Sequence, residues 1–278
     1  MLWGTGGLAG SLLGQLAGLH PLAVAAYRLL LGGAAGLVAV RRKPRSVTEV
    51  LIVGGLFAFF QTTYFAAVAL SSVGAATMTT IGAAPVLLTI AAAMRRRPRP
   101  WTLVSVAGAV AGLVLLRWSP GETAAGMILA LLAAAGFAVL TALPRKDDPA
   151  VTTAFGCLAG GLLLTPAALA VGMGLPARPD VLLTAAYFGV VPTALAYAAY
   201  FRGLAGAHPV LGALSALLEP LTATVLSVVF LHERLSTPAW CGAALLVGAL
   251  AIGYWRPEPS AGRAAAGGRG SRTAAGRP

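Results

Sequence analysis

Long apolar stretches separated by short polar turns cover residues 2 to 255. A helix needs roughly 20 largely apolar residues to cross the roughly 30 Å hydrocarbon core of a membrane, and most of these stretches are near that length. A membrane β-strand would instead alternate apolar and polar positions over roughly 10 residues. The pattern therefore predicts an all-α polytopic membrane protein with ten transmembrane helices, over residues 2–18, 22–40, 48–69, 74–94, 101–117, 124–143, 151–173, 181–201, 208–231 and 238–255.

The composition agrees with a membrane protein and argues against two other classes. Of the 278 residues, 58% are hydrophobic and only 10% are charged, whereas soluble domains contain about 25% charged residues. The net charge of +12 would suggest nucleic-acid binding in a soluble protein, but here most Lys and Arg lie in short clusters between the apolar stretches. Cys157 and Cys241 lie inside apolar stretches without CxxC spacing, so we expect neither a disulfide nor a metal site.

The basic clusters predict the orientation of the chain, because cytoplasmic loops of membrane proteins carry an excess of Lys and Arg. The loops on the opposite side hold only Arg117, Arg178 and Arg234. We therefore expect an inner-membrane protein with both termini in the cytoplasm. The residues that follow the even-numbered predicted spans are Arg41, Arg42, Lys43, Arg45, Arg95, Arg96, Arg97, Arg99, Arg145, Lys146 and Arg202, together with the arginines of the tail.

The two halves of the chain resemble each other, which indicates an internal repeat. Tyr64 and Phe65 align with Tyr200 and Phe201, Pro85 aligns with Pro220, and a Gly/Ala-rich helix ends each half. Five spans in each half place the second half upside down relative to the first, an arrangement typical of secondary transporters. We expect a first repeat over 1–118, whose short first helix an upstream start would extend, a second repeat over 119–255, and a disordered basic cytoplasmic tail over 256–278.

The second half also carries a family pattern. Tyr200-Phe201, Leu218-Glu219-Pro220, the turn from Phe230 to Ser236, Gly242 and Gly248 together resemble the EamA family of the drug/metabolite transporter superfamily. Leu2-Trp3-Gly4 and Tyr27-Arg28 resemble the first two helices of that family. The resemblance covers residues 2–255 and implies ten helices in two repeats, with export of amino acids, other metabolites or drugs. The first half departs from the family pattern, because Arg95-Arg96-Arg97-Pro98 stands where an acidic residue often ends the fourth helix.

Glu219 is the first candidate for a functional site. It lies directly before Pro220 in an apolar stretch, and a charged side chain at the membrane centre costs about 2.5–3.5 kcal/mol on insertion scales. One interpretation is a group that binds a proton or a cation. The other is a structural carboxylate held by an arginine or by backbone amides freed by Pro220. Ala84 precedes Pro85 in the first repeat, so the carboxylate has no acidic counterpart there.

Arg28, inside the second predicted span, has three open interpretations. It binds a substrate carboxylate, it is the counter-ion of Glu219, or its side chain extends to the outer interface. Tyr197 and Tyr200 share one helix face, and we favour them as pore-lining aromatics. Pro85 and Pro220 are predicted hinges, with fixed kinks as the alternative.

Other polar residues inside the spans are candidates for the cavity wall, although Ser and Thr also serve helix packing or bond their own helix. The complete set of predicted substrate- or proton-binding residues is Glu219, Arg28, Tyr197, Tyr200, Gln61, Tyr64, Thr80 and Ser215.

These observations predict a secondary active transporter that exports a small metabolite, amino acid or drug by alternating access, coupled to inward proton movement through Glu219. A facilitative uniporter or channel-like permease is the alternative. A membrane-embedded enzyme would need a nucleophile or metal constellation at one interface, and the sequence contains none. The sequence also lacks the GxxxxGK[ST] motif of ATP-driven proteins. We expect no cofactor and no nucleic-acid partner, only the lipid bilayer, a small-molecule substrate and protons, in a monomer or homodimer.

Overall fold

The computed structural model describes residues 2–40, 42–71, 73–94, 98–116, 123–204, 207–219 and 237–255. Every regular element within these ranges is a helix. In chain order the elements are η1 (Leu2–Thr5), α1 (Gly6–Ala17), α2 (Pro21–Ala39), α3 (Val47–Leu70), α4 (Val73–Ala93), α5 (Pro100–Leu116), α6 (Ala124–Ala142), α7 (Pro149–Ala170), α8 (Pro179–Gly189), η2 (Val190–Leu195), α9 (Ala196–Leu204), α10 (Pro209–Ala216) and α12 (Thr237–Trp255).

The length and composition of these helices agree with the predicted all-α polytopic fold. Six helical segments are long and apolar enough to cross a membrane, and two others, Pro100–Leu115 and Trp240–Gly253, are apolar but shorter. In the first and ninth predicted spans the described helices α1 and α10 have 12 and 8 residues, so the total of ten spans stays a prediction. The six segments long and apolar enough to cross a membrane are Pro21–Ala39, Val47–Leu70, Ala76–Ala93, Ala124–Ala142, Pro149–Ala170 and Pro179–Leu204.

Short polar residues set where several helices begin and end. Ser46, Thr123 and Asp148 precede α3, α6 and α7, and each side chain accepts a hydrogen bond from a first-turn N–H, at 3.2, 3.1 and 2.8 Å. These bonds satisfy donors that have no partner within the helix. Pro149 follows Asp148 at the first helical position, where its fixed φ fits. Gly18 ends α1 in the left-handed conformation, with φ of 63°, which glycine adopts without a steric cost.

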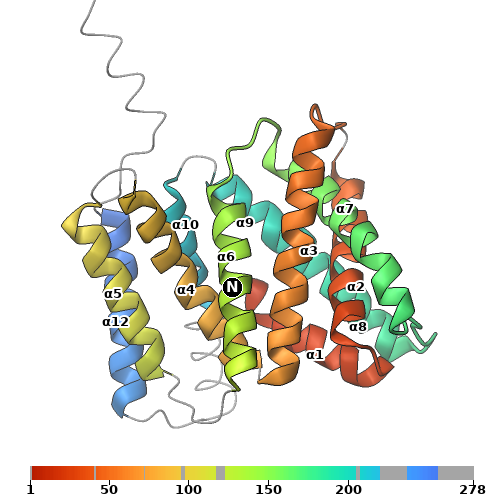
Figure 1. Ribbon diagram of the computed structural model, residues 1–278, viewed down its shortest axis with the longest axis horizontal. Coiled ribbons are helices and arrows are strands. Elements are labelled where there is room, and N and C mark those ends of the chain that lie inside the picture. The colour runs from red at the N-terminus through yellow and green to blue at the C-terminus, as the bar shows by residue number, and fades with distance from the viewer. Residues whose placement is uncertain are drawn as a thin grey trace, which may run out of the picture.

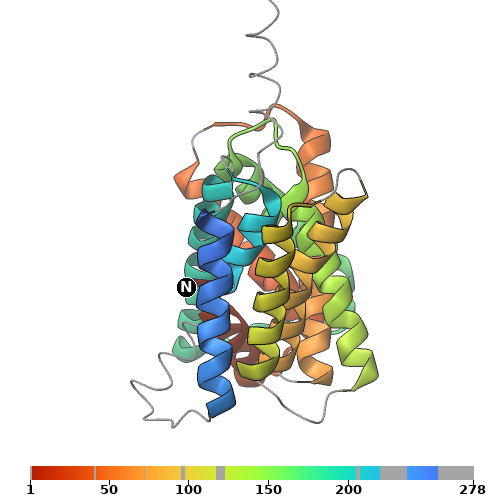
Figure 2. The same ribbon diagram turned by 90° about the vertical axis from the view of Figure 1, so that its left-hand side faces the viewer.

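The helices form a single bundle (Figure 1). α5 and α12 lie side by side at one end of it, as Figure 2 also shows, and α2 packs against α7 and α8 at the other end. α3, α4 and α6 lie between these groups and contact one another. The loops 42–46 and 143–148 both lie at the upper ends of the helices in Figure 1, and this is the end of the bundle meant below. η1 begins at about mid-height of the bundle (Figures 1 and 2), and Trp3 within it packs edge-on against Phe137 and Tyr197.

Glycine permits the closest helix contacts. A Cβ atom at Gly33 of α2 would lie 2.5 Å from the backbone nitrogen of Leu158 in α7. A Cβ atom at Gly160 of α7 would lie 2.5 Å from the carbonyl oxygen of Gly54 in α3. In a membrane, where lipid tails are as apolar as leucine, such close backbone approach is a main source of helix association. The glycine-rich composition therefore fixes how α2, α3 and α7 pack.

Candidate functional site

A cavity lies between helices from both halves of the chain. Among the described residues, two charged side chains lie on its wall, Arg28 of α2 and Glu219, which follows α10. Tyr64, Thr80 and Tyr197 also line it, so five of the eight predicted site residues meet at one cavity. The other lining residues are Trp3, Gly7, Phe60, Thr77, Ile81, Phe137 and Ala216.

Three hydrogen bonds hold the Arg28 guanidinium in place. Its Nε donates to Thr193 Oγ1 at 3.3 Å, Nη1 to Gln61 Oε1 at 3.2 Å and Nη2 to the Pro192 carbonyl at 3.3 Å. Gln61 in turn donates from Nε2 to the Tyr197 hydroxyl at 2.6 Å. The Arg28 side chain is 5% exposed, and it forms no ion pair with any residue that the structure describes. Arg28 is therefore a buried cation that the protein orients with neutral groups.

Aromatic rings surround this cation. The guanidinium carbon lies 5.8 Å from the ring centre of Phe65, 5.3 Å from that of Phe188 and 5.9 Å from that of Tyr197. The negative face of an aromatic ring attracts a cation at such distances, and more strongly where water is excluded. The rings partly replace the water that burial removes from Arg28.

The π-helix η2 supplies two of the Arg28 acceptors. η2 interrupts the long helix formed by α8 and α9, and Thr193 within it donates to the Phe188 carbonyl five residues earlier at 2.7 Å. Gly32 of α2 leaves room for the Thr193 side chain, because a Cβ atom at Gly32 would overlap it. π-Helical turns inside α-helices are frequent at functional sites. Here the wider turn brings Pro192 and Thr193 to Arg28.

Two adjacent glycines let α1 approach the cavity residues. A Cβ atom at Gly6 would lie 2.9 Å from Arg28 Nη2, and one at Gly7 would lie 2.6 Å from the Tyr64 hydroxyl. That hydroxyl shares a hydrogen bond of 2.7 Å with Thr77 Oγ1. The Gly-rich start of the chain thus makes space for the polar wall of the cavity.

The other predicted site residues lie away from the cavity wall. Gln61 is fully buried behind it and connects Arg28 with Tyr197. Tyr200 lies in an aromatic cluster and shares a hydrogen bond of 3.1 Å with Thr141. Ser215 donates to the Leu211 carbonyl of its own helix at 2.8 Å.

The structure describes only one of the two predicted hinges, Pro85. Pro85 lies inside α4, where its carbonyl accepts a hydrogen bond from Thr89 Oγ1 at 2.8 Å. Pro220 lies outside the described residues.

Sequence reasoning selected Tyr64 and Tyr197 but not the aromatic wall residues Trp3, Phe60 and Phe137. Trp3 packs against Tyr200 at 4.6 Å between ring centres, and Phe137 packs against Phe60 at 5.6 Å and Tyr200 at 5.6 Å. An apolar ring in a membrane helix has the same sequence signal whether it faces lipid or a cavity. Only the position of Trp3 in the Leu2-Trp3-Gly4 pattern gave a hint.

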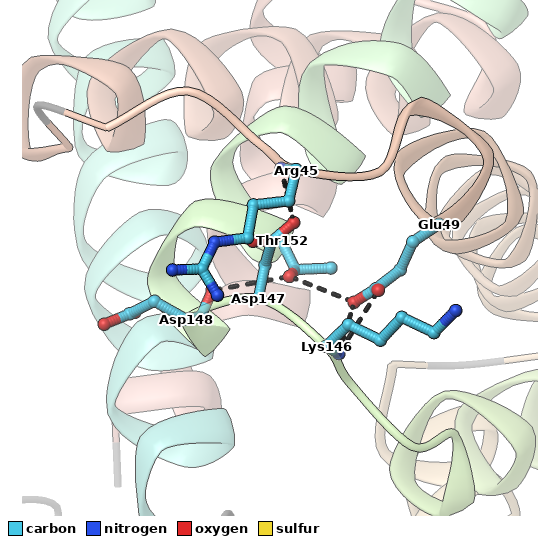
Figure 3. Close-up of polar contacts among 6 residues, drawn as sticks. All are labelled: Arg45, Glu49, Lys146, Asp147, Asp148 and Thr152. Atoms are coloured by element: carbon cyan, nitrogen blue, oxygen red, sulfur yellow. Dashed lines mark hydrogen bonds and ion pairs between the residues drawn. The ribbon is translucent and has the colours of Figure 1, made fainter.

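A second polar cluster lies at the end of the bundle that carries residues 42–46 and 143–148 (Figure 3). Glu49 of α3 is 9% exposed, and both of its carboxylate oxygens accept from the Lys146 backbone N–H at 3.2 Å. Thr152 Oγ1 donates to Glu49 at 3.4 Å. Asp147 accepts from the Arg45 backbone N–H at 2.8 Å. The α6–α7 loop is thereby attached to the start of α3.

Arg145 closes the same region from the other side of the loop. Its guanidinium carbon lies 3.6 Å from the Phe201 ring centre, and Nη2 donates to the Leu140 carbonyl at 3.3 Å. Burial lowers the pKa of Arg145 to about 10, while the nearby Glu49 carboxylate acts in the opposite direction. Arg145 therefore remains a cation at neutral pH, stacked on the end of α9.

Replacing Glu49 by alanine is expected to lower the thermal midpoint of the purified protein. The change leaves the Lys146 N–H without its acceptor, at a cost of about 1–3 kcal/mol, whereas Thr152 Oγ1 keeps its bond to the Asp148 carbonyl at 3.3 Å. Asp180→Ala is the matched control, because Asp180 and its ion-pair partner Arg178 are both exposed and surface pairs contribute about 0–1 kcal/mol. Equal midpoints for Glu49→Ala and wild type would contradict this role of Glu49.

The groups on the cavity wall indicate what kind of molecule the cavity can bind. Among the described residues, no group of three or more His, Cys, Asp or Glu side chains is placed to hold a metal ion. The cavity instead combines one oriented cation, one carboxylate, several hydroxyls and apolar walls. These groups suit a small molecule with both polar and apolar parts.

Comparison with known proteins supports this view. Residues 123–255 match the EamA-like transporter family. The chain is 32% identical over 260 residues to the uncharacterized transporter YwfM of Bacillus subtilis (strain 168), covering 88% of this chain and 87% of that protein. A protein of known crystal structure shares the fold, with a TM-score of 0.73 and 24% identity, covering 91% of this chain and 93% of its own. These relatives indicate a membrane transporter rather than an enzyme, and the chain belongs to the EamA-like transporter family.

Proposed function

We propose that this protein is a secondary active transporter that exports a small metabolite, amino acid or drug across the inner membrane by alternating access. The observation that carries the proposal is the cavity between helices of both halves, with Arg28 and Glu219 on its wall. Intramembrane ionisable residues usually face substrate or ion paths. In the proposal Arg28, Tyr64, Thr80, Tyr197 and Glu219 contact the substrate or proton.

The helix contacts support two inverted repeats, 1–118 and 119–255. If α1 to α5 correspond to the five helical segments from α6 to α12, then α2 packs against its counterpart α7, and α5 against its counterpart α12. The α3–α6 contact is matched by α1–α8, and the α3–α7 contact by α2–α8. A two-fold axis in the membrane plane generates such matched pairs, and substrate sites in inverted-repeat transporters lie at the repeat interface.

Alternating access requires that the two halves move relative to each other. Pro85 of α4 and Pro220 are the proposed bending points, since a proline removes one helical hydrogen bond. Gln61, Tyr200 and Ser215 are proposed to support the cavity from behind its wall.

The proposed orientation has both termini in the cytoplasm, with residues 256–278 as a cytoplasmic tail. Arg45 and Lys146 belong to loops at one end of the bundle (Figure 1), and Arg202 lies in the last turn of α9. An excess of basic residues in short loops favours the cytoplasmic side.

Transport assays test the function directly. Cells with and without the protein are screened for tolerance to metabolites and drugs, and the purified chain in liposomes is then assayed for counterflow of the selected compound. We expect uptake of labelled compound to saturate and to be accelerated by unlabelled compound on the opposite side. Transport that neither saturates nor shows counterflow would indicate a channel-like permease and would contradict alternating access.

A further inference from the structure

Arg28 has unused hydrogen-bonding capacity on the cavity wall. A guanidinium carries five N–H donors and stays protonated at all relevant pH values. Three of these donors are used by Thr193, Gln61 and Pro192, so two remain. Arg28 forms no direct ion pair with a described residue, although Glu219 on the same wall interacts with it electrostatically. Burying a cation is costly, and that cost falls when an anion binds beside it. The protein keeps this cation in a fixed position and leaves part of it open.

A second donor without a partner lies on the same wall. The Nε1 atom of Trp3 is buried and has no hydrogen-bond partner among the described residues. Buried polar groups in native proteins are nearly always satisfied, so such an orphan often marks a site where a ligand or water completes the bond. Trp3 and Arg28 both line the cavity. Each carries N–H donors that have no acceptor among the described residues.

The rest of the cavity wall is mainly apolar. Trp3, Phe60, Ile81 and Phe137 contribute rings and an aliphatic side chain, and these surfaces bind an apolar or aromatic body by exclusion of water. The cavity wall therefore combines N–H donors on Arg28 and Trp3, which have no acceptor in the described part of the chain, with apolar side chains.

We propose that the cavity binds a small organic anion, a carboxylate joined to an apolar or aromatic body, with the carboxylate on the two free N–H groups of Arg28. This proposal rests on the transport function proposed above and names its substrate class. A planar guanidinium matches the two oxygens of a carboxylate. Gln61 and Thr193 are positioning residues that orient the guanidinium toward the ligand.

Binding of an anion in this cavity depends on whether Glu219 carries a proton. The titratable and charged groups on the cavity wall are Arg28, Tyr64, Tyr197 and Glu219, and tyrosine hydroxyls are neutral near pH 7. An ionised Glu219 would repel an anion in the same low-dielectric space. The anion therefore binds best when Glu219 carries a proton, so ligand and proton bind together. This differs from the exchange of proton for substrate expected from the sequence, and export then follows the substrate gradient.

Ligand binding to the full-length protein in detergent tests the charge of the substrate. The probes are benzoate, its neutral analogue benzamide and the cation benzylammonium, each titrated against the thermal midpoint at about pH 6 and about pH 8, where benzoate is ionised. We expect benzoate to bind at least about tenfold more tightly than benzamide, which corresponds to one charge-assisted interaction. Tighter binding of benzylammonium or benzamide than of benzoate would overturn the proposal.

Four variants locate the anion. Arg28→Gln should remove the preference for benzoate, Trp3→Phe should weaken benzoate binding about tenfold, and Arg202→Gln, which removes an exposed cation at the end of α9, should leave it unchanged. Wild type should bind benzoate more weakly at the higher pH, whereas Glu219→Gln should bind it equally at both. An unchanged benzoate preference in Arg28→Gln would overturn the proposal, and the probe series on the wild type decides the charge even if that variant does not fold.

The two proposals fail in different ways. Counterflow of a neutral or cationic compound, without Arg28-dependent benzoate binding, would retain the transporter and reject the anion site. Benzoate binding that depends on Arg28, in a protein that shows no counterflow of any selected compound, would retain the anion site and reject the proposed function.

Discussion

Glu219→Gln is expected to abolish transport driven by a pH gradient while leaving exchange of substrate across the liposome membrane. Glutamine has nearly the shape of the carboxylic acid but takes up and releases no proton. Glu219 is the only acidic residue on the wall of the described cavity, so this substitution removes the carboxylate that is proposed to couple transport to a proton gradient. The measurement is the initial rate of transport into liposomes with and without an imposed pH difference.

Asp180→Asn is the matched control for this substitution. Asp180 is an exposed carboxylate in the first turn of α8, paired with Arg178 at the surface. The same chemical change there should leave both the driven rate and the exchange rate at wild-type values. Wild-type driven rates for Glu219→Gln at all pH values would remove Glu219 from the coupling step.

Gly33→Leu is expected to prevent folding of the protein. The Cβ atom alone would lie 2.5 Å from the backbone nitrogen and 2.8 Å from the Cα atom of Leu158, so α2 and α7 must separate. Overpacking typically costs about 1–3 kcal/mol, and a clash with backbone instead of a flexible side chain lies at the upper end or beyond it. The measurement is the yield of monodisperse protein on size-exclusion chromatography, with Gly33→Ala expected between wild type and Gly33→Leu.

Gly55→Leu provides the control, because it makes the same change inside the apolar helix α3. No heavy atom outside its own backbone surroundings lies within 4 Å of a Cβ atom at Gly55. Leucine also has a higher helix propensity than glycine, so the yield should equal or exceed that of wild type. Similar losses for Gly33→Leu and Gly55→Leu would mean that the close approach of α2 and α7 does not decide stability.

The helical, multi-pass character was predictable because the apolar stretches are long and the charges lie between them. The glycines of α2 and α7 were visible as composition, but the faces that meet were not, since a small residue has the same signal on a lipid face and at a helix contact. Gly55 and Gly33 illustrate the difference. Glycine-rich sequence alone does not separate them, and only the tertiary contacts do.

The candidate site was partly predictable. Glu219 and Arg28 stand out because charge is rare in membrane helices, and both line the cavity. Glu49 did not stand out, because Ser46 and Glu49 form the spacing of a local capping box. Its carboxylate instead reaches the Lys146 N–H, nearly a hundred residues along the chain. A local pattern hid a tertiary contact.

The π-helix η2 also decides which side of α9 faces the cavity. A π-turn holds one residue more than an α-turn, and one residue in an α-helix corresponds to a rotation of about 100°. Everything after Leu195 is therefore turned relative to an uninterrupted continuation of α8. Without that single extra residue, Tyr197 would turn away from the cavity and lose its hydrogen bond with Gln61, and the Phe201 ring would no longer lie under the Arg145 guanidinium. The phase of one helix thus sets the cavity wall and the contact that closes the end of the bundle at the same time.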